Sequence, residues 1–291
     1  MLNKYKFILQ IAVSLFLISY LITFLDWDRV MDLEPIVWST LFGGVLFVLA
    51  TLSFMAVRWR LLIEYRKNQK VEFSLALKGY LLGGFFNIFM PGSIGGDLMR
   101  IKYMADKAQI NLKESGLLVL IERIIGLTAL GFIFIVGAVY SFDMHEKYFS
   151  FNYLLIIIML LPVLVYIKYK VSTYVSLNYF RYLLVFFLSV AAHISDVILV
   201  YFFMFVLDIN LNFSFLLFIM PLVYIATIIP ISLGGLGVRE ATMSGLLVLF
   251  SIEPSQGVLV AFMLYLSKVL AGILGSKEAM SFMKVNFICK S

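Results

Sequence analysis

Long apolar runs alternate with short polar segments along the whole chain, a pattern typical of polytopic membrane proteins. About 20 apolar residues cross a hydrocarbon core of about 30 Å as an α-helix. Six runs are long enough to be predicted as full transmembrane helices: residues 7–25, 36–57, 116–140, 151–167, 183–207 and 257–275. The first run is too long for a secretory signal peptide and no small-residue cleavage site follows it, so we expect it to be retained.

Two further apolar stretches, 73–112 and 214–252, are each broken near the middle by proline, serine and glycine. The first break reads Met90-Pro-Gly-Ser-Ile-Gly-Gly96, and the second reads Ile229-Pro-Ile-Ser-Leu-Gly-Gly-Leu-Gly237. Clusters of this kind end a helix. We therefore predict two broken segments, each either a re-entrant hairpin or a pair of short spanning helices.

The two breaks match each other at an offset of 139 residues. The matched pairs are Pro91 and Pro230, Ser93 and Ser232, Gly95 and Gly234, Gly96 and Gly235, and Arg100 and Arg239. Three predicted full helices lie between the breaks, and an odd number of crossings inverts the second copy. The sequence thus predicts an all-α polytopic membrane protein with inverted repeats, as in many secondary transporters, with repeat halves at approximately 36–140 and 183–275.

Basic residues concentrate in alternate loops, which gives the predicted orientation. On one side lie Lys4, Lys6, Arg58, Arg60, Arg66, Lys67, Lys70, Arg100, Lys102, Lys107, Lys113, Lys168, Lys170, Arg181, Lys277, Lys284 and Lys290. The opposite loops carry only Arg29 and Lys147. By the positive-inside rule, we predict a multi-pass protein of the cytoplasmic (inner) cell membrane with both termini cytoplasmic.

Composition removes most other classes of protein. The chain is 63% hydrophobic and 14% charged, whereas a soluble domain is roughly 45–50% apolar and about 25% charged. We therefore predict a single integral membrane domain over residues 1–291, with no nucleic acid as partner. One cysteine, Cys289, and two histidines leave no material for a disulfide or a His-rich metal centre, so no metal or cofactor is expected.

The two breaks are the predicted substrate-binding region. A non-helical backbone inside a membrane survives only where it is buried in protein or lines a wet cavity, and helix N-termini there attract anions. Arg100 and Arg239 follow the breaks and add a full positive charge at each. Asp97 and Glu240 lie beside them and are expected to balance that charge.

Three smaller polar residues complete the expected site at the breaks: Ser93, Ser232 and Asn87, the last of which is expected to cap or bridge freed backbone groups. The competing interpretation is that both segments are proline-kinked helices packed through small residues, as in an ordinary helix bundle. The two matching copies in inverted register favour a functional cavity.

Ionisable residues also fall inside the predicted full helices, where they are costly and usually functional or paired. Glu122 and Arg123 lie one or two turns into the 116–140 helix and are included among the candidate site residues, although a local pair with snorkelling of Arg123 is the alternative. His193 and Asp196 share one face of the 183–207 helix. They either relay protons or hold a cationic headgroup, or they form an ordinary buried hydrogen bond.

Two other basic features are predicted to lie at the cytoplasmic interface. Lys268, late in the last helix, is expected to snorkel toward the cytoplasm. The sequence Arg58-Trp59-Arg60 is expected to be an aromatic and basic anchor that can also meet lipid phosphates.

Four ordered motifs give the chain a family resemblance. They are Arg58-Trp59-Arg60-Leu-Leu, Asn87-x-x-Met-Pro-Gly-Ser-Ile-Gly-Gly-Asp97-x-x-Arg100, Glu122-Arg123-x-x-Gly126 and Pro230-x-Ser-x-Gly-Gly-Leu-Gly-Val-Arg239-Glu240. With these motifs the sequence resembles the lysylphosphatidylglycerol synthase transmembrane-region family of flippase-like membrane proteins over nearly its whole length. In two-part relatives this region precedes a cytoplasmic aminoacyl-transferase domain, which we expect to be missing here. The resemblance implies handling of a phospholipid or an isoprenoid-linked lipid.

The function that agrees best with these features is a lipid flippase, with Arg100 and Arg239 holding a phosphate and Asp97, Glu122 and Glu240 balancing charge. The expected partners are membrane lipids, either an anionic phospholipid or a polyprenyl-phosphate-linked lipid. A membrane-embedded lipid-modifying transferase, with Asp97 or Glu240 as base, is one alternative, but the sequence has no metal-binding acidic cluster such as DDxxD to support it. A non-transporting partner of enzymes of lipid or polysaccharide synthesis is the other.

Overall fold

The computed structural model describes residue 19 and residues 34–90, 94–142, 167, 169–175, 178–229, 232 and 234–284. The predicted helices at 7–25 and 151–167 lie almost wholly outside the described residues, as do Pro91, Ser93 and Pro230 of the breaks. The described residues are helical and contain no β-strand. The prediction of an all-α protein is confirmed for this part of the chain.

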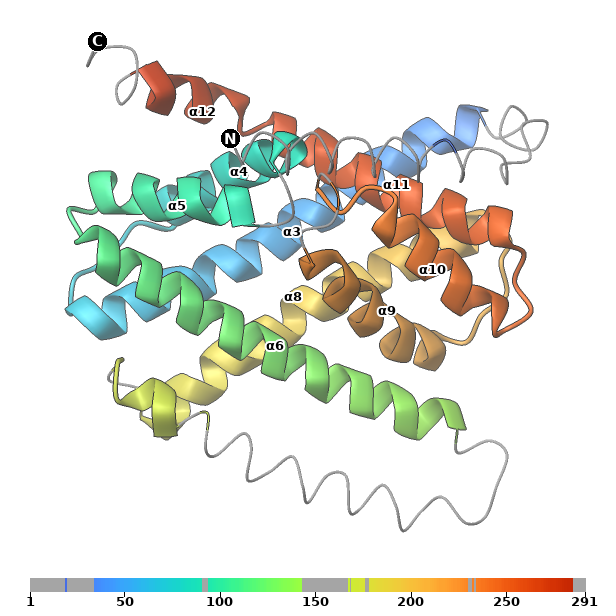
Figure 1. Ribbon diagram of the computed structural model, residues 1–291, viewed down its shortest axis with the longest axis horizontal. Helices are drawn as coiled ribbons and strands as arrows, with labels where there is room; N and C mark the ends of the chain where they lie inside the picture. The colour runs from blue at the N-terminus through green and yellow to red at the C-terminus, as the bar shows by residue number, and fades with distance from the viewer. Residues whose placement is uncertain are drawn as a thin grey trace, which may run out of the picture.

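Four long helices match four of the predicted full transmembrane helices. They are α3 (Glu34–Lys67), α6 (Leu112–Phe142), α8 (Tyr179–Val206) and α11 (Pro254–Ile273). Each is long and apolar enough to cross a membrane. Figure 1 shows α3, α6 and α8 crossing most of the molecule along its long axis, while the shorter α11 lies in the half that holds α9 and α10.

Each predicted broken segment is a pair of shorter helices. The first pair is α4 (Phe73–Phe89) with α5 (Ile94–Lys107), and the second is α9 (Phe213–Ile228) with α10 (Val238–Val248). A last short helix, α12, spans Ser276–Met283. Figure 1 shows α4 and α5 toward one end of the molecule and α9 and α10 toward the other.

Glycine explains why the second chain break can turn so sharply. Gly234, Gly235 and Gly237 have φ values of 58°, 78° and 84°, a region that residues with a side chain rarely occupy. These three residues lead directly into α10, with Gly237 as its N-cap. The sequence Gly-Gly-Leu-Gly is therefore needed for the backbone path and not merely for close packing.

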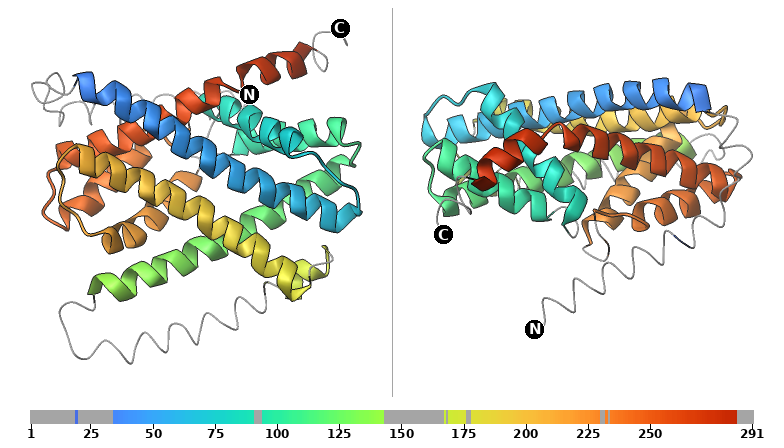
Figure 2. Two further views of the ribbon diagram at one scale, coloured as in Figure 1. Left: turned by 180° about the vertical axis from the view of Figure 1, so that it is seen from behind. Right: turned by 90° about the horizontal axis from the view of Figure 1, so that it is seen from above.

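The helices pack in a pattern that links the two halves. α3 packs along α8 (Figure 2), α6 packs along α9, and α11 packs along α4. Two apolar clusters form the interior, one centred on α3–α6 and the start of α8, and the other on α8–α11 and the start of α3. The last long helix of each half thus lies against the first short helix of the other half.

Close backbone approaches hold these contacts together. Gly83 of α4 faces Gly96 of α5, and Gly84 of α4 faces Gly272 of α11. Small residues allow helices in a membrane to approach closely enough for extensive van der Waals contact. The two breaks themselves touch, since the Gly234 N–H donates to the Met90 carbonyl oxygen at 3.3 Å.

The contact between α6 and α9 gives a stability prediction. A methyl group added at Gly137 would meet the backbone of Leu217 and Phe218, which has no flexible end to move aside. Gly137→Ala should therefore lower the free energy of unfolding by about 1–3 kcal/mol through overpacking, and lower the melting temperature of the detergent-purified protein.

Gly131→Ala is the matched control on the same helix, because a Cβ there meets nothing within 4 Å. It should leave the melting temperature unchanged or raise it slightly, since alanine favours a helix more than glycine does. Equal losses in the two variants would contradict the packing of α6 on α9.

Candidate functional site

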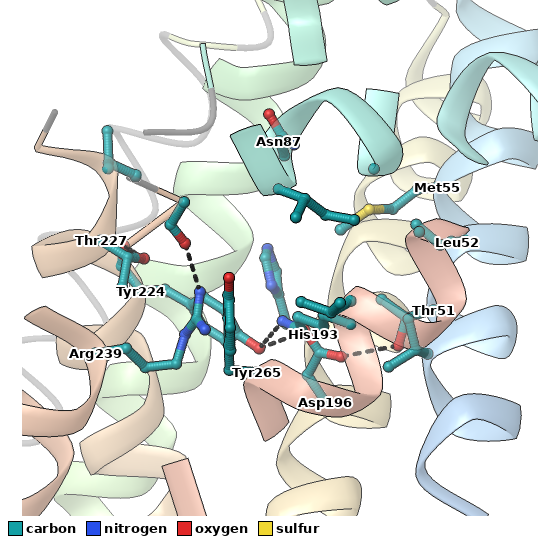
Figure 3. Close-up of a pocket in the computed structure, with 18 of the residues that line it drawn as sticks. Thr51, Leu52, Met55, Asn87, His193, Asp196, Tyr224, Thr227, Arg239 and Tyr265 are labelled. Carbon is teal, nitrogen blue, oxygen red and sulfur yellow. Dashed lines mark hydrogen bonds and ion pairs between the residues drawn. The ribbon is translucent and has the colours of Figure 1, made fainter. Parts of the chain in front are cut away.

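Two adjoining cavities lie between the broken segments. The first cavity, of about 450 Å³, is lined by residues around the first break, and the second, of about 310 Å³, by residues around the second break. Asn87, Arg123 and His193 line both. In the second cavity Asn87 lies across from Arg239, Tyr265 and Asp196 (Figure 3).

Glu122 of α6 is the central acid of the first cavity. It is 1% exposed, and its Oε1 lies 2.6 Å from Arg58 Nη2 of α3 and accepts a hydrogen bond from the Tyr80 hydroxyl of α4. Arg58 also donates to the Ser189 hydroxyl of α8 at 2.8 Å. One buried ion pair therefore joins four helices.

Arg100 of α5 is enclosed on all sides. Its Nη2 lies 3.0 Å from Glu122 Oε2 and 3.1 Å from Asp97 Oδ1. Its guanidinium stacks at 4.1 Å from the Tyr80 ring centroid and 4.7 Å from the Trp59 ring centroid. Such cation–π contacts add to the ion pairs when the group is desolvated.

Asp97 and Asn87 organise the start of α5. The carboxylate of Asp97 pairs with Arg100 and also with Arg123 of α6, whose Nε lies 2.8 Å and Nη2 2.6 Å from Asp97 Oδ2. The Asn87 Oδ1 accepts a hydrogen bond from the Gly96 N–H at 2.8 Å. The prediction that Asn87 bridges freed backbone groups at the break is confirmed.

Arg239 of α10 reaches into the second cavity with fewer partners. Its Nη2 donates to the Gly234 carbonyl at 3.2 Å, and its guanidinium lies 5.4 Å from the Tyr265 ring centroid. Its Nε and Nη1 find no hydrogen-bond partner among the described residues. The neighbouring Glu240 instead accepts from the Gly237 N–H at 2.6 Å and so caps the start of α10.

A second buried ion pair stands beside Arg239. Lys268 Nζ of α11 lies 3.0 Å from Asp196 Oδ2 of α8 and 3.1 Å from the Tyr224 hydroxyl of α9. The same carboxylate accepts hydrogen bonds from Tyr224 and, at 3.0 Å, from the Thr51 hydroxyl. The prediction that Lys268 snorkels toward the cytoplasm is wrong, because its ammonium group pairs with the buried carboxylate of Asp196.

The anchor predicted at Arg58-Trp59-Arg60 is also wrong for two of its three residues. Arg58 and Trp59 are buried, the first in the ion pair with Glu122 and the second against Arg100. Only Arg60 is on the outside, paired with Glu64 one turn along α3 at 2.9 Å. The motif faces inward because Glu122 of α6 pairs with Arg58, while Tyr80 of α4 and Arg100 of α5 pack against Trp59.

Most of the predicted site residues come together. Those lining one or both cavities are Asn87, Asp97, Arg100, Glu122, Arg123 and Arg239. Ser232 is fully buried and Glu240 nearly so, and neither is among the residues that line the cavities, while Ser93 lies outside the described residues. Among the described residues, no group of three or more His, Cys, Asp or Glu side chains could hold a metal ion.

Sequence reasoning overlooked the partners that complete these networks. They are Thr51, Tyr80, Ser189, Tyr224 and Tyr265. The one signal available was a tyrosine within each of the short apolar helices α4 and α9, since a buried hydroxyl needs a hydrogen-bond partner. Nothing in the sequence pairs those tyrosines with particular carboxylates.

Comparison with known proteins identifies the family. The sequence profile of the lysylphosphatidylglycerol synthase TM region matches residues 7–174 and 168–275, which is most of the chain. The chain belongs to the lysylphosphatidylglycerol synthase TM region family. No curated protein matches it. The resemblance carried by the four sequence motifs is thus confirmed, and the protein is a membrane protein by family as well as by its long apolar helices.

The buried acid at the centre of this family member's first cavity gives a second stability prediction. Glu122→Gln would remove the negative charge that pairs with the buried arginines Arg58 and Arg100. Removing one partner of a buried ion pair costs about 3–5 kcal/mol. We expect a large fall in the melting temperature of the purified protein.

Glu114→Gln is the control, because Glu114 lies on the same helix but pairs with Lys67 and Arg66 at the partly exposed first turn. Pairs of that kind contribute about 0–1 kcal/mol. If Glu122→Gln is as mild as Glu114→Gln, the buried network does not stabilise the fold.

Proposed function

We propose that the protein is a lipid flippase of the cytoplasmic membrane. In this proposal a phosphate-bearing headgroup, of a phospholipid or an isoprenoid-linked lipid, moves through the two cavities while its chains stay in the surrounding lipid. Six full transmembrane helices and two inverted broken segments form the transporter, with both termini in the cytoplasm. Transport, rather than chemical modification of the lipid, is the proposed activity.

The packing pattern supports the inverted repeat. Exchanging α3 with α8, α4 with α9, α5 with α10 and α6 with α11 maps the α3–α8 contact onto itself and every other substantial packing contact among these eight helices onto another one. The two pairs of short helices lie toward opposite ends of the molecule (Figure 1). Alternating access in such folds is a rocking of one repeat against the other around a central site.

The ion pairs follow the same exchange. In the first half a base on α3 meets an acid on α6, and a tyrosine of α4 donates to the acid. In the second half an acid on α8 meets a base on α11, and a tyrosine of α9 donates to the acid. In each half, one buried ion pair therefore connects the two long helices. The base is on the first long helix in one half and on the last long helix in the other.

The single observation that carries the proposal is the cationic lining of the adjoining cavities. Five cationic side chains line them against three carboxylates: Arg58, Arg100, Arg123, Arg239 and Lys268 against Asp97, Glu122 and Asp196. A cavity of that sign between two helix breaks favours a phosphate group. Apolar side chains such as Leu52, Met55 and Ile228 make up other parts of the wall and suit the lipid's upper chains.

The inverted arrangement predicts opposite accessibility of two loops. In a variant with Cys289 replaced by serine, Asn210→Cys in the loop between α8 and α9 should react with a membrane-impermeant maleimide on intact cells. Lys107→Cys at the end of α5 should react only after the membrane is permeabilised. Labelling of both cysteines from the same side would contradict the inverted repeat.

Lipid transport is tested in proteoliposomes by the loss of fluorescence of headgroup-labelled lipids when an impermeant reductant is added outside. Arg239→Lys should already slow transport, because an ammonium cannot reproduce the two parallel hydrogen bonds of a guanidinium to phosphate. Arg239→Ala should cost more, about 1.5–3 kcal/mol or ten- to a hundredfold in affinity.

The double variant Arg239→Ala/Glu240→Ala distinguishes a phosphate contact from charge neutralisation. Because Glu240 accepts its hydrogen bond from Gly237, we expect no rescue by the double change. Arg60→Ala, which lies outside both cavities, should transport at the wild-type rate. Rescue at wild-type expression, or no transport of any lipid by the wild-type protein, would refute the proposal.

A further inference from the structure

The two arginines at matched positions of the breaks differ in the charged groups around them, although Nε and Nη1 of both lack a hydrogen-bond partner among the described residues. Arg100 Nη2 has two carboxylate oxygens at 3.0 and 3.1 Å, and the guanidinium lies near two aromatic rings. Arg239 has one backbone carbonyl at 3.2 Å and one ring. The charge of Arg100 is thus balanced by neighbouring carboxylates, whereas no carboxylate of the described residues lies within ion-pair distance of Arg239.

Arg239 is built to receive an anion. The residue is only 8% exposed, it lines the second cavity, and its Nε and Nη1 have no hydrogen-bond partner among the described residues. Each of these nitrogens can donate a charge-assisted hydrogen bond to a phosphate oxygen. Figure 3 shows the Arg239 side chain at the edge of the cavity, beside Tyr265 and near Tyr224.

Lys268 supplies a second cation to the same cavity. Its side chain is 29% exposed and its only ion pair among the described residues is with Asp196. Asp196 does not depend on it alone, because Tyr224 and Thr51 also donate to that carboxylate. Lys268 can therefore leave Asp196 without leaving an unbonded buried carboxylate behind.

The charge balance around the two cavities selects the ligand's charge. The five cations that line them face three lining carboxylates and the adjacent buried carboxylate of Glu240, which leaves a formal excess of one positive charge. Uncompensated charge in a low-dielectric interior is costly. A ligand with one negative charge neutralises the site, whereas a zwitterion leaves the excess in place.

We propose that Arg239 and Lys268 form a binding site for a phosphodiester monoanion, and that Lys268 moves from Asp196 to the phosphate when the ligand binds. Asp196 then keeps its hydrogen bonds from Tyr224 and Thr51. Arg100 is a positioning residue that holds Glu122 and Asp97 and does not touch the ligand. This inference rests on the proposed function and narrows the headgroup to a net-anionic one.

Binding is measured in detergent by the ligand-dependent rise in melting temperature, with three soluble probes. Dihexanoyl phosphatidylglycerol carries the monoanionic phosphodiester on a lipid, dihexanoyl phosphatidylcholine carries a zwitterion, and dimethyl phosphate carries the anion without a lipid. We expect a saturable rise with phosphatidylglycerol, at least a tenfold weaker effect with phosphatidylcholine, and a weaker but competing effect of dimethyl phosphate.

Variants assign the site. Arg239→Gln and Lys268→Gln should each weaken phosphatidylglycerol binding at least tenfold, while Lys78→Gln, at an exposed lysine 3.9 Å from Glu278, should bind as the wild type does. Asp196→Asn should bind more tightly than the wild type, because it releases Lys268 from its competitor. A merely structural ion pair would not give this gain in affinity. Asp196→Asn therefore still tests the proposal if Lys268→Gln folds poorly.

Unchanged binding by Lys268→Gln, equal binding of the zwitterionic lipid, or weaker binding by Asp196→Asn would overturn the inference. A response to dimethyl phosphate with none to phosphatidylglycerol would likewise overturn a lipid headgroup as the ligand. Selective binding without transport in proteoliposomes would refute the proposed flippase and leave the site standing. Transport without selectivity for the anionic lipid would refute this binding site and leave the proposed flippase standing.

Discussion

A backbone that leaves the helical path inside a membrane has to find partners for its N–H and C=O groups in the absence of water, and the rest of this structure depends on that constraint. The partners come from nearby: Asn87 for Gly96, the Glu240 carboxylate for Gly237, and Met90 for Gly234. The last of these connects the two breaks. Satisfying the broken backbone therefore also fixes where the two halves of the molecule meet.

The charges are arranged around the same region. Buried ion pairs are favourable only when further hydrogen bonds satisfy the remaining lone pairs and protons. Tyr80 provides such a bond at Glu122, and Tyr224 and Thr51 provide them at Asp196. The surplus is left on the basic side, at Arg239 most of all. In the proposed function, this positive surplus is what attracts a phosphate-bearing headgroup.

The positions of the helices and of the breaks could be predicted from the sequence, because proline and glycine end a helix at the place where they occur. The four described full helices and both breaks lie where the apolar runs and the Pro-Ser-Gly-Gly clusters place them. Arg100 and Arg239 were found because they follow those clusters. The ion pairs were not predictable in the same way, since Lys268 lies 72 residues from Asp196 and Arg58 lies 64 residues from Glu122. Their partners depend on which helices become neighbours, and a single sequence does not show that.

The glycines of α4 have a mechanical consequence. On one side Gly83 meets Gly96 of α5, on another Gly84 meets Gly272 of α11, and near its middle the carbonyl of Leu81 lies against Gly275, just before α12. At Gly96 and Gly275 an added Cβ would meet a carbonyl oxygen of α4, so a larger residue at either position would push a neighbouring segment away from α4. The position of α4 therefore depends on these small residues as much as on the hydrogen bonds of Tyr80 and Asn87.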